Sequence, residues 1–260
     1  MDGLDAIFRW LHVFAGIIWI GHLYFFNFVN GPTQAKLDGA AKKAVVPELM
    51  PRALYWFRWG AAWTWITGVL LLLIVYYHGQ LMFPQGVSWH AGGIIMILVT
   101  FLAVFAYDVL WKSGLGSNVR TGAIVSFILL SIVVALYVYV GKFEYRAVLI
   151  HTGSMFGTIM AFNVWYRIWP SQQKIIRAVK NGEAPDANLV KLAGLRSRHN
   201  TYMSLPLLWA MINFHTTVPF SGGAWGIPSA YYWVVWLGLI ALGWHVVFQC
   251  FKKAGKVEGF

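Results

Sequence analysis

Charged residues and cysteine are the scarcest features of this sequence. Only 11% of the 260 residues are charged, 59% are hydrophobic and the mean hydropathy is +0.61, whereas about a quarter of a typical soluble domain is charged. The single cysteine, Cys250, excludes a disulfide framework, a four-cysteine zinc site and an iron–sulfur cluster. No Cys-x-x-Cys-His sequence is present, which excludes covalent c-type haem. Paired catalytic carboxylates and a Ser/His/Asp arrangement with interpretable spacing are also missing.

Apolar runs of about twenty residues recur along the chain, and each is long enough to cross a bilayer core of about 30 Å. Proline and glycine in the intervening segments predict connections there. We therefore expect an all-α polytopic membrane helix bundle, a single transmembrane domain over residues 1–260. Its seven transmembrane helices are expected at about 6–28, 53–77, 90–111, 121–141, 146–169, 200–219 and 228–251.

The distribution of lysine and arginine predicts the orientation of these helices. Sixteen of the 20 Lys and Arg residues lie in segments 29–52, 112–120, 167–199 and after 251, and none lies in 78–89 or 220–227. Basic loops stay in the cytoplasm, so the N-terminus is expected outside and the C-terminus inside. The first span lacks a small-residue cleavage site and is interpreted as a retained helix rather than a signal peptide. The expected location is the bacterial inner (cytoplasmic) membrane.

Six histidines fall within or at the ends of the apolar segments, at two depths. The outer set is His12, His151 and His215, and the inner set is His22, His199 and His245. His12 and His22 are ten residues apart on one helix, which places them about 15 Å apart along its axis on one broad side. The first helix can therefore offer one imidazole to each of two stacked sites.

Paired imidazoles in an apolar bundle, with few carboxylates, favour b-type haem as the cofactor, and all six histidines are candidate ligands of its iron. One or two haems are compatible with the pattern. Arginines near each level can pair with the propionates: Arg9 and Arg146 outside, Arg196 and Arg198 inside. Hydrogen-bonded structural histidines are the alternative, and a zinc site is a weaker one because it needs three close ligands.

Other polar and aromatic residues have two interpretations each. His78 and His90 are expected in the membrane interface, and Arg58 and Asp108 either neutralise each other or form a proton path. The aromatic stretch Tyr55–Trp65 is typical of an interfacial belt, although a quinone can also stack there. Small residues spaced along 151–165 allow either close helix packing or contact with a flat macrocycle.

Four stretches together resemble one family. They are RWLHVFAGIIWIG (Arg9–Gly21), HTGSMFGTIMAFNVW (His151–Trp165), IWPSQQKII (Ile168–Ile176) and RSRHNTYMSLPLLWAMINFH (Arg196–His215). They are similar to the urate oxidase N-terminal domain, the membrane domain of bacterial urate hydroxylases of the PuuD type. The resemblance covers essentially the whole chain and is most specific over 151–215. It carries over His12, His151, His199, His215 and His245, whereas His22 enters from the depth argument alone.

The resemblance implies a redox function. Full-length members have an eighth helix and a C-terminal cytochrome c domain, and they oxidise urate to 5-hydroxyisourate with electrons passed to cytochrome c. Because this sequence ends after the seventh expected helix, we expect it to lack both of those parts and to use a separate redox protein.

The leading hypothesis is an integral membrane b-type haem electron-transfer protein or subunit, passing electrons between a redox partner and the quinone or cytochrome c pool. A urate or purine hydroxylase using an external cytochrome c is the first alternative, so the sequence leaves open whether the chain is itself an enzyme. A non-redox transporter or structural subunit is the second alternative. The expected partners are membrane lipid and cytochrome c or a dehydrogenase or oxidase complex, with no nucleic acid. The basic segment 167–199 is expected to be a cytoplasmic loop that either docks a partner or is merely solvated.

Overall fold

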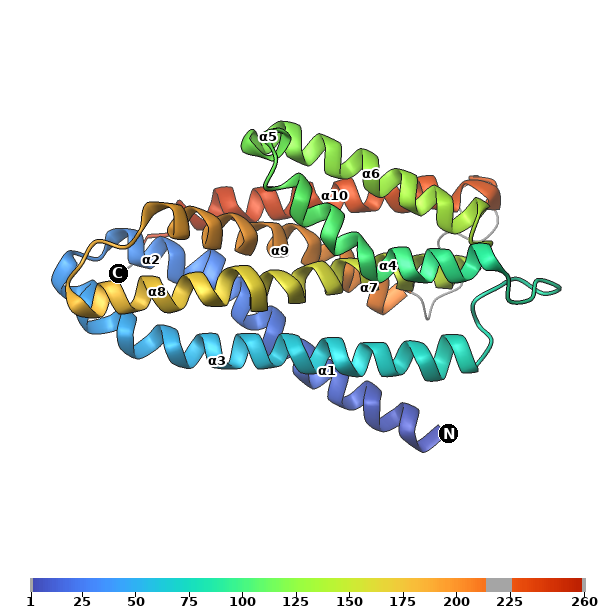
Figure 1. The fold of residues 1–260 in the computed structure, drawn as a ribbon, viewed down its shortest axis with the longest axis horizontal. Coiled ribbons are helices and arrows are strands. Elements are labelled where there is room, and N and C mark those ends of the chain that lie inside the picture. The colour runs from blue at the N-terminus through green and yellow to red at the C-terminus, as the bar shows by residue number, and fades with distance from the viewer. Residues whose placement is uncertain (1, 214–225, 259–260) are drawn as a thin grey trace. The chain divides into compact units, whose positions relative to one another are not determined.

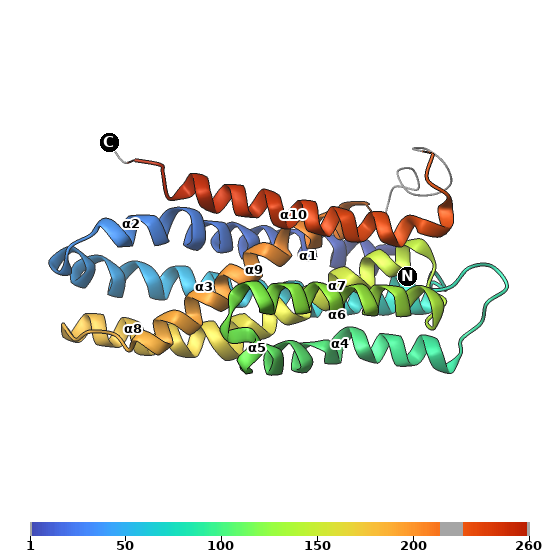
Figure 2. The same cartoon turned by 90° about the horizontal axis from the view of Figure 1, so that it is seen from above.

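Helices account for nearly all of the chain that the structure describes. The computed structural model describes residues 2–213 and 226–258, and no strand occurs within these ranges (Figures 1 and 2). The expected all-α class is confirmed. Short π-helical turns (η1–η3) and a 3-10 turn (η4) punctuate the α-helices. In chain order the elements are α1 (Asp2–Tyr24), η1 (Phe25–Asn30), α2 (Gly31–Lys36), α3 (Gly39–Leu71), η2 (Leu72–His78), α4 (Ala91–Leu110), α5 (Gly114–Ser117), α6 (Val119–Tyr139), α7 (Tyr145–Asn163), η3 (Val164–Ile168), α8 (Trp169–Asn181), α9 (Ala187–Asn213), η4 (Ser229–Tyr231) and α10 (Tyr232–Ala254).

Six continuous helical segments are long and apolar enough to cross a membrane, which is compatible with a multi-pass membrane protein. They are Gly3–Lys36, Gly39–His78, Ala91–Leu110, Val119–Tyr139, Tyr145–Asn181 and Tyr232–Ala254. The expected span 200–219 coincides with the end of α9 as far as residue 213, where its description ends. α9 is too polar to join the six because it carries His199, Asn200, Thr201 and Ser204, the last three of them buried.

The segment 29–52, expected as a loop, is mostly helical. α2 follows η1 without a break, and α3 begins at Gly39 rather than near 53. Asp38 caps α3, since its Oδ1 accepts a hydrogen bond from the Ala41 amide at 2.8 Å. Pro47 and Pro51, interpreted as boundaries, lie inside α3. The expectation of a loop was wrong because α3 starts at the Asp38 cap and continues through both prolines, while it packs against α8.

The segment 167–199 is likewise helical for most of its length. α7 continues through η3 into α8, with Pro170 in the first turn, where a missing amide hydrogen costs little. α8 ends at Gly182, whose φ of 78° is left-handed. Asp186 then caps α9, accepting from the Asn188 amide at 2.7 Å. The expected basic cytoplasmic loop is therefore two helices joined by a short turn.

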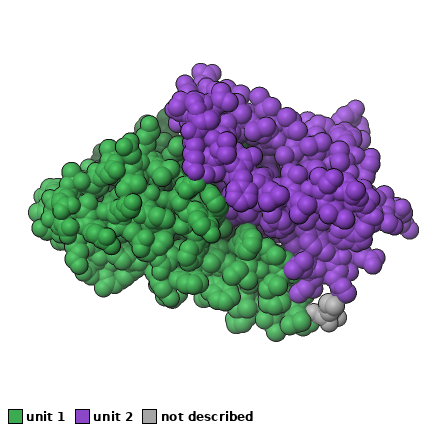
Figure 3. All heavy atoms as spheres, in the orientation of Figure 1, with its two compact units in different colours: residues 1–71, 160–205, 243–260 green, residues 72–159, 206–242 purple. Residues whose placement is uncertain are grey.

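The chain forms two compact units, coloured separately in Figure 3. Unit 1 comprises residues 1–71, 160–205 and 243–260, and unit 2 comprises 72–159 and 206–242. Unit 1 holds α1, α3, α8 and most of α9. Unit 2 holds α4, α6 and most of α7. Each boundary falls inside a continuous helical segment rather than in a linker, so the units are not separate domains in sequence.

In unit 1, α1 packs closely along α3 (Figure 1). Gly60, Thr64 and Gly68 recur every four residues of α3 and form a small-residue stripe. A Cβ at Gly60 would lie 3.0 Å from the Trp19 backbone nitrogen and 3.3 Å from the Ala15 carbonyl oxygen. This stripe lets the two backbones approach more closely than larger side chains would permit.

In unit 2, the small residues of α7 serve close helix packing. A Cβ at Gly153 would lie 3.0 Å from Ala210 Cβ and 3.2 Å from Met211 Cε, both on the unit 2 end of α9. The small residues of 151–165 were expected to allow either close helix packing or contact with a flat macrocycle. The contact of Gly153 with α9 is an instance of close helix packing, and it lies near buried His151.

Candidate functional site

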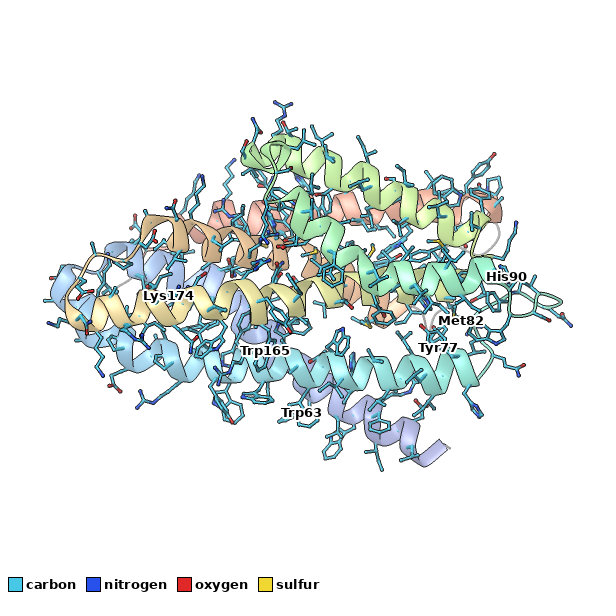
Figure 4. The ribbon with its side chains drawn as sticks, in the orientation of Figure 1. Trp63, Tyr77, Met82, His90, Trp165 and Lys174 are labelled. Carbon is cyan, nitrogen blue, oxygen red and sulfur yellow. The ribbon has the colours of Figure 1, made fainter. Side chains whose placement is uncertain are left out.

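His151 is the most enclosed imidazole in the described chain. Its exposed fraction is 0%. Its Nδ1–H donates to the Ala147 carbonyl at 2.8 Å, so its Nε2 accepts, and the Tyr77 hydroxyl donates to it at 3.1 Å. Tyr77, which Figure 4 labels, is the penultimate residue of η2, and all of η2 lies in unit 2. Both ring nitrogens are thus hydrogen-bonded within the protein.

Aromatic rings surround His151. The ring centroids of Tyr76, Tyr77, Tyr137 and Phe143 lie 6.4, 5.8, 6.1 and 4.8 Å from that of the imidazole. Buried Tyr137 donates to Thr100 Oγ1 at 2.7 Å, because the Thr100 hydroxyl proton is given to the carbonyl oxygen of Met96, at 3.0 Å. We call the rings of Tyr76, Tyr77, Tyr137 and Phe143 the aromatic box. They pack around His151, both of whose ring nitrogens are hydrogen-bonded.

His12 lies in unit 1 against α3. Its Nδ1 is 3.1 Å from Thr67 Oγ1, whose own proton is donated to the Trp63 carbonyl at 2.6 Å, so Nδ1–H is the donor. A Cβ at Gly68 would lie 3.0 Å from His12 Cε1. The imidazole therefore fits against a bare stretch of helix backbone and links α1 to α3.

His22 and His245 are more open than His12 and His151. His22 is half-buried, and its Nδ1–H donates to the Ile18 carbonyl at 2.8 Å, which leaves Nε2 with its lone pair. His245 is exposed on α10, with its Nε2 3.1 Å from Gln249 Nε2. Within the described residues, the hydrogen bonds and ring contacts of each imidazole stay on its own helical segment.

A buried polar cluster joins the end of α7 to α9 in unit 1. Asn163 Nδ2 donates to Asn200 Oδ1 at 2.9 Å, and Asn200 Nδ2 donates to the Met160 carbonyl at 3.0 Å. Arg196, one turn before Asn200 on α9, has an exposed fraction of 0%. Half-buried His199 adjoins Asn200 in the chain. A guanidinium and two amides are thus held inside an apolar bundle.

Two further hydrogen bonds tie α1 and η1 to α9 beside that cluster. Asn27 Nδ2 donates to Ser197 Oγ at 2.8 Å and to the Leu23 carbonyl at 2.9 Å. The hydroxyls of Tyr24 and Ser204 are 3.0 Å apart, and since Ser204 donates to the Thr201 carbonyl at 2.8 Å, Tyr24 is the donor between them. Hydrogen bonds between polar side chains, and not apolar packing alone, therefore hold α1 and η1 against α9 in unit 1.

The two expected histidine sets are distributed differently between the units. All three members of the inner set, His22, His199 and His245, lie in unit 1. The outer set is divided, with His12 in unit 1 and His151 in unit 2, and His215 lies outside the described residues. No group of three or more His, Cys, Asp or Glu side chains in the described ranges is placed to hold a metal ion.

The candidate propionate partners have protein contacts of their own. Arg9 pairs with Asp5 at 2.8 Å and Arg146 with Glu144 at 3.7 Å. Exposed Arg198 stacks over Phe251, 4.9 Å from the ring centroid. The outer arginines are thus engaged by neighbouring carboxylates.

Arg58 and Asp108 also have identifiable contacts. The Arg58 guanidinium carbon lies 4.0 Å from the Trp169 ring centroid and within 5.8 Å of the Tyr55 and Trp165 rings. Asp108 pairs with Lys112 at 2.7 Å. An aromatic cage and a local ion pair hold these two charges in place.

The comparison with known families gives one match. The model of the family described as urate oxidase N-terminal matches residues 37–257. The chain belongs to this family. No curated protein and no solved structure matches it.

The matched region of this urate oxidase N-terminal chain contains both sites described above. It includes the aromatic box around His151 and the Asn163–Asn200 cluster with Arg196. It begins at residue 37 and so does not include the helix that carries His12 and His22. Both sites therefore belong to the part that the family model describes.

Several partners at these sites could not be found from the sequence. Tyr77 and Tyr137 lie in apolar stretches with nothing to mark them as neighbours of His151, 74 and 14 residues away in the chain. Asn163 and Asn200 are 37 residues apart, and nothing in the sequence marks them as partners. For Gly68 a signal was available in the four-residue recurrence of small residues in α3, whereas Thr67 lies outside that recurrence.

Proposed function

We propose that this chain is a membrane-embedded electron-transfer protein that holds b-type haem and passes electrons between a redox partner and the quinone or cytochrome c pool. Membership of the urate oxidase N-terminal family supports an oxidoreductase setting. The observation that carries the proposal is the state of His22. Its Nδ1–H is fixed on the Ile18 carbonyl at 2.8 Å, and its Nε2 is left to accept.

The chemistry of the imidazoles distinguishes a suitable iron ligand from unsuitable ones. A ligating histidine donates one ring N–H to a carbonyl or carboxylate and presents the other nitrogen to the metal. His22 meets both conditions. His151 meets only the first, because Tyr77 already donates to its Nε2 at 3.1 Å. The donor set therefore fits one haem associated with unit 1 better than a second haem at the level of His151.

The residues of unit 1 would hold the group as follows. His22 would supply one nitrogen ligand to the iron, and His199 would supply a second. His245 is less suited, because Gln249 donates to its Nε2 at 3.1 Å. Arg196 and Arg198 would face the propionates, since guanidinium groups pair well with carboxylates. Haem b supplies one-electron redox chemistry when bound. Asn27 and Tyr24 keep α1 in place against α9 through their bonds to Ser197 and Ser204.

The membrane setting belongs to the same proposal. We place the chain as a multi-pass protein of the bacterial cytoplasmic membrane, with α9 as a seventh span that is shielded by the other helices. The N-terminus would lie outside and the C-terminus in the cytoplasm, as the positive-inside rule indicates. The polar face of α9 is acceptable in a membrane because Asn200, Thr201 and Ser204 are each 0% exposed.

A reduced-minus-oxidised absorbance spectrum of the purified chain, with haem measured as the pyridine haemochrome, tests the proposal. We expect a b-type signal at about one haem per chain. His22→Ala is expected to abolish it, and His78→Ala, at an exposed position, is the matched control. A haem-free preparation from haem-replete cells, or full haem content in His22→Ala, would overturn the assignment.

Oxidation of urate is the second candidate, and the buried cluster of unit 1 favours it specifically. The guanidinium of Arg196 and the amides of Asn163 and Asn200 supply the donors and acceptors that a planar, oxygen-rich anion requires. In that reaction urate and water give 5-hydroxyisourate, two protons and two electrons, and two molecules of an external cytochrome c take the electrons. Urate-dependent reduction of added cytochrome c by the wild-type chain, lost in Asn200→Ala, is the expected result. If haem-loaded protein shows no urate-dependent reduction of cytochrome c, urate oxidation is ruled out and electron transfer remains the proposed function.

A further inference from the structure

Two helical segments of unit 1 form an antiparallel pair, which we name the basic helix pair: residues 39–58 of α3 and 169–182 of α8. At one end Arg58 lies over the Trp169 ring at 4.0 Å. At the other end a Cβ on Gly182 would lie 3.3 Å from Lys43 Nζ. Residue numbers rise along one helix as they fall along the other between these contacts. The two helices are therefore paired over about 20 Å of length.

The continuous helical segments that contain the basic helix pair are longer than a membrane requires. The helices of the pair are parts of the continuous segments Gly39–His78 and Tyr145–Asn181, of 40 and 37 residues. Such helices are about 60 and 55 Å long, whereas the hydrocarbon core is about 30 Å thick. A substantial part of each helix must then project beyond the core, and the charged ends of both are the parts that do so.

The charges of the basic helix pair are almost all positive. Its only acidic residue is Glu48, which is already bonded to Arg52 at 2.7 Å. Figure 4 labels one of its lysines, Lys174, on α8. The exposed cationic side chains are Lys43, Arg52, Lys174, Arg177 and Lys180.

The outer cations are too far from a bilayer to serve lipid headgroups. Exposed Tyr55 and Trp56 are typical of a membrane interface and mark where α3 leaves the membrane. Lys43 is twelve residues before Tyr55, or about 18 Å along the helix. Lys180 is eleven residues beyond Trp169, or about 17 Å. A headgroup layer adds only about 5–8 Å to each side, and charges are screened over about 8 Å.

We infer that the basic helix pair is a docking surface for a water-soluble protein with a carboxylate-rich face. The positive-inside rule accounts for the sign of these charges, but flexible loops close to the membrane would satisfy it. A rigid pair of helices that carries exposed cations beyond the headgroups goes further than that rule requires, and it suits electrostatic steering of a folded acidic partner. This inference does not depend on haem or urate chemistry.

The full chain in phosphatidylcholine nanodiscs, with flavodoxin as an acidic soluble probe, provides the test. The variant carries Lys174→Glu, Arg177→Glu and Lys180→Glu. The matched control carries Lys252→Glu, Lys253→Glu and Lys256→Glu, with the same change in charge at exposed positions of the C-terminal end. A third protein with Lys174→Gln, Arg177→Gln and Lys180→Gln keeps helix-forming side chains, and circular dichroism checks that each variant folds.

We expect flavodoxin to bind the wild type at low salt and the Glu variant at least about tenfold more weakly, with the Gln variant between them and the control close to wild type. Raising the salt should abolish binding. The inference is overturned if flavodoxin does not bind, or if flavodoxin with amidated carboxylates binds equally well. It is overturned too if the control variant at the C-terminal end loses as much affinity as the Glu variant of α8. It is also overturned if phosphatidylserine vesicles or a single-stranded RNA depend on the three α8 cations while flavodoxin does not.

Discussion

The Tyr77 hydroxyl donates to Nε2 of buried His151 at 3.1 Å and thereby completes the hydrogen bonding of that ring. The pair lies in unit 2, and the rings of Tyr76, Tyr137 and Phe143 also lie beside the imidazole. It identifies His151 as a residue whose two nitrogens are used for structure, although its sequence context suggested a ligand.

Tyr77→Phe should lower the free energy of unfolding by about 1–3 kcal/mol, because it leaves a buried acceptor without its donor. Thermal unfolding in detergent measures the loss. Tyr139→Phe, at an exposed tyrosine, is the control and should change stability little. If both variants unfold alike, the hydrogen bond to His151 does not contribute.

Haem content should be insensitive to the same substitution. If Tyr77 rather than iron satisfies His151, then Tyr77→Phe and His151→Asn should retain the pyridine haemochrome that His22→Ala loses. Loss of haem in His151→Asn, with the protein still folded by circular dichroism, would show that His151 does ligate iron and that Tyr77 moves aside for it.

Gly68→Ala and His12→Ala should be coupled. A Cβ at position 68 meets the His12 ring at 3.0 Å, so Gly68→Ala should destabilise the wild type by about 1–3 kcal/mol and much less when His12 is already alanine. A double-mutant cycle on unfolding free energies measures this. Equal costs in both backgrounds would contradict the contact.

Gly60→Ala provides the contrast to that cycle. Its Cβ would meet the backbone of Trp19 and Ala15 rather than a side chain, so its cost should persist in the His12→Ala background. Gly238→Ala, where nothing lies within 4 Å, should instead be neutral or stabilising by up to about 1 kcal/mol. The three glycines together separate tight packing from the general effect of alanine in a helix.

Asp38→Ala should loosen the first turn of α3. The lost cap costs about 0.5–2 kcal/mol, and hydrogen exchange of the amides that follow Asp38 should accelerate accordingly. Glu183→Ala, in the turn after α8, removes an acidic residue that caps no helix in the described chain and should leave that exchange unchanged. Unaltered exchange in Asp38→Ala would mean that packing against α8 alone fixes the start of α3.

The sequence predicted the helical class and the approximate centres of the apolar helices because hydropathy reports directly on what a bilayer accepts. It misjudged the ends. Pro47 and Pro51 were interpreted as boundaries although the cap at Asp38 starts the helix earlier, and the extent of helix in the basic segment 167–199 was underestimated. Mean hydropathy does not mark an amphipathic helix such as α8, whose apolar residues recur at helical spacing instead.

The site was predictable at the level of residue type and not of partnership. His12 and His151 were singled out because an imidazole in an apolar helix needs a reason, and each is hydrogen-bonded to a residue of another helical segment. Which group satisfies each ring depends on contacts such as His12 with Thr67, 55 residues away. Periodicity within one helix cannot supply that information. The Asn163–Asn200 bond is a further example, because the two amides are 37 residues apart and neither indicates the other.

The turn at residues 182–186, which joins α8 to α9 at one end of the basic helix pair, has a practical value of its own. It lies between a helix that ends in a left-handed glycine and one that starts on an aspartate cap. A helical fusion domain spliced into this turn, in phase with α8 and α9, would be held stiffly away from the detergent or lipid belt. For a chain of 29.4 kDa, such a fiducial would give electron cryomicroscopy an asymmetric feature by which particles can be aligned.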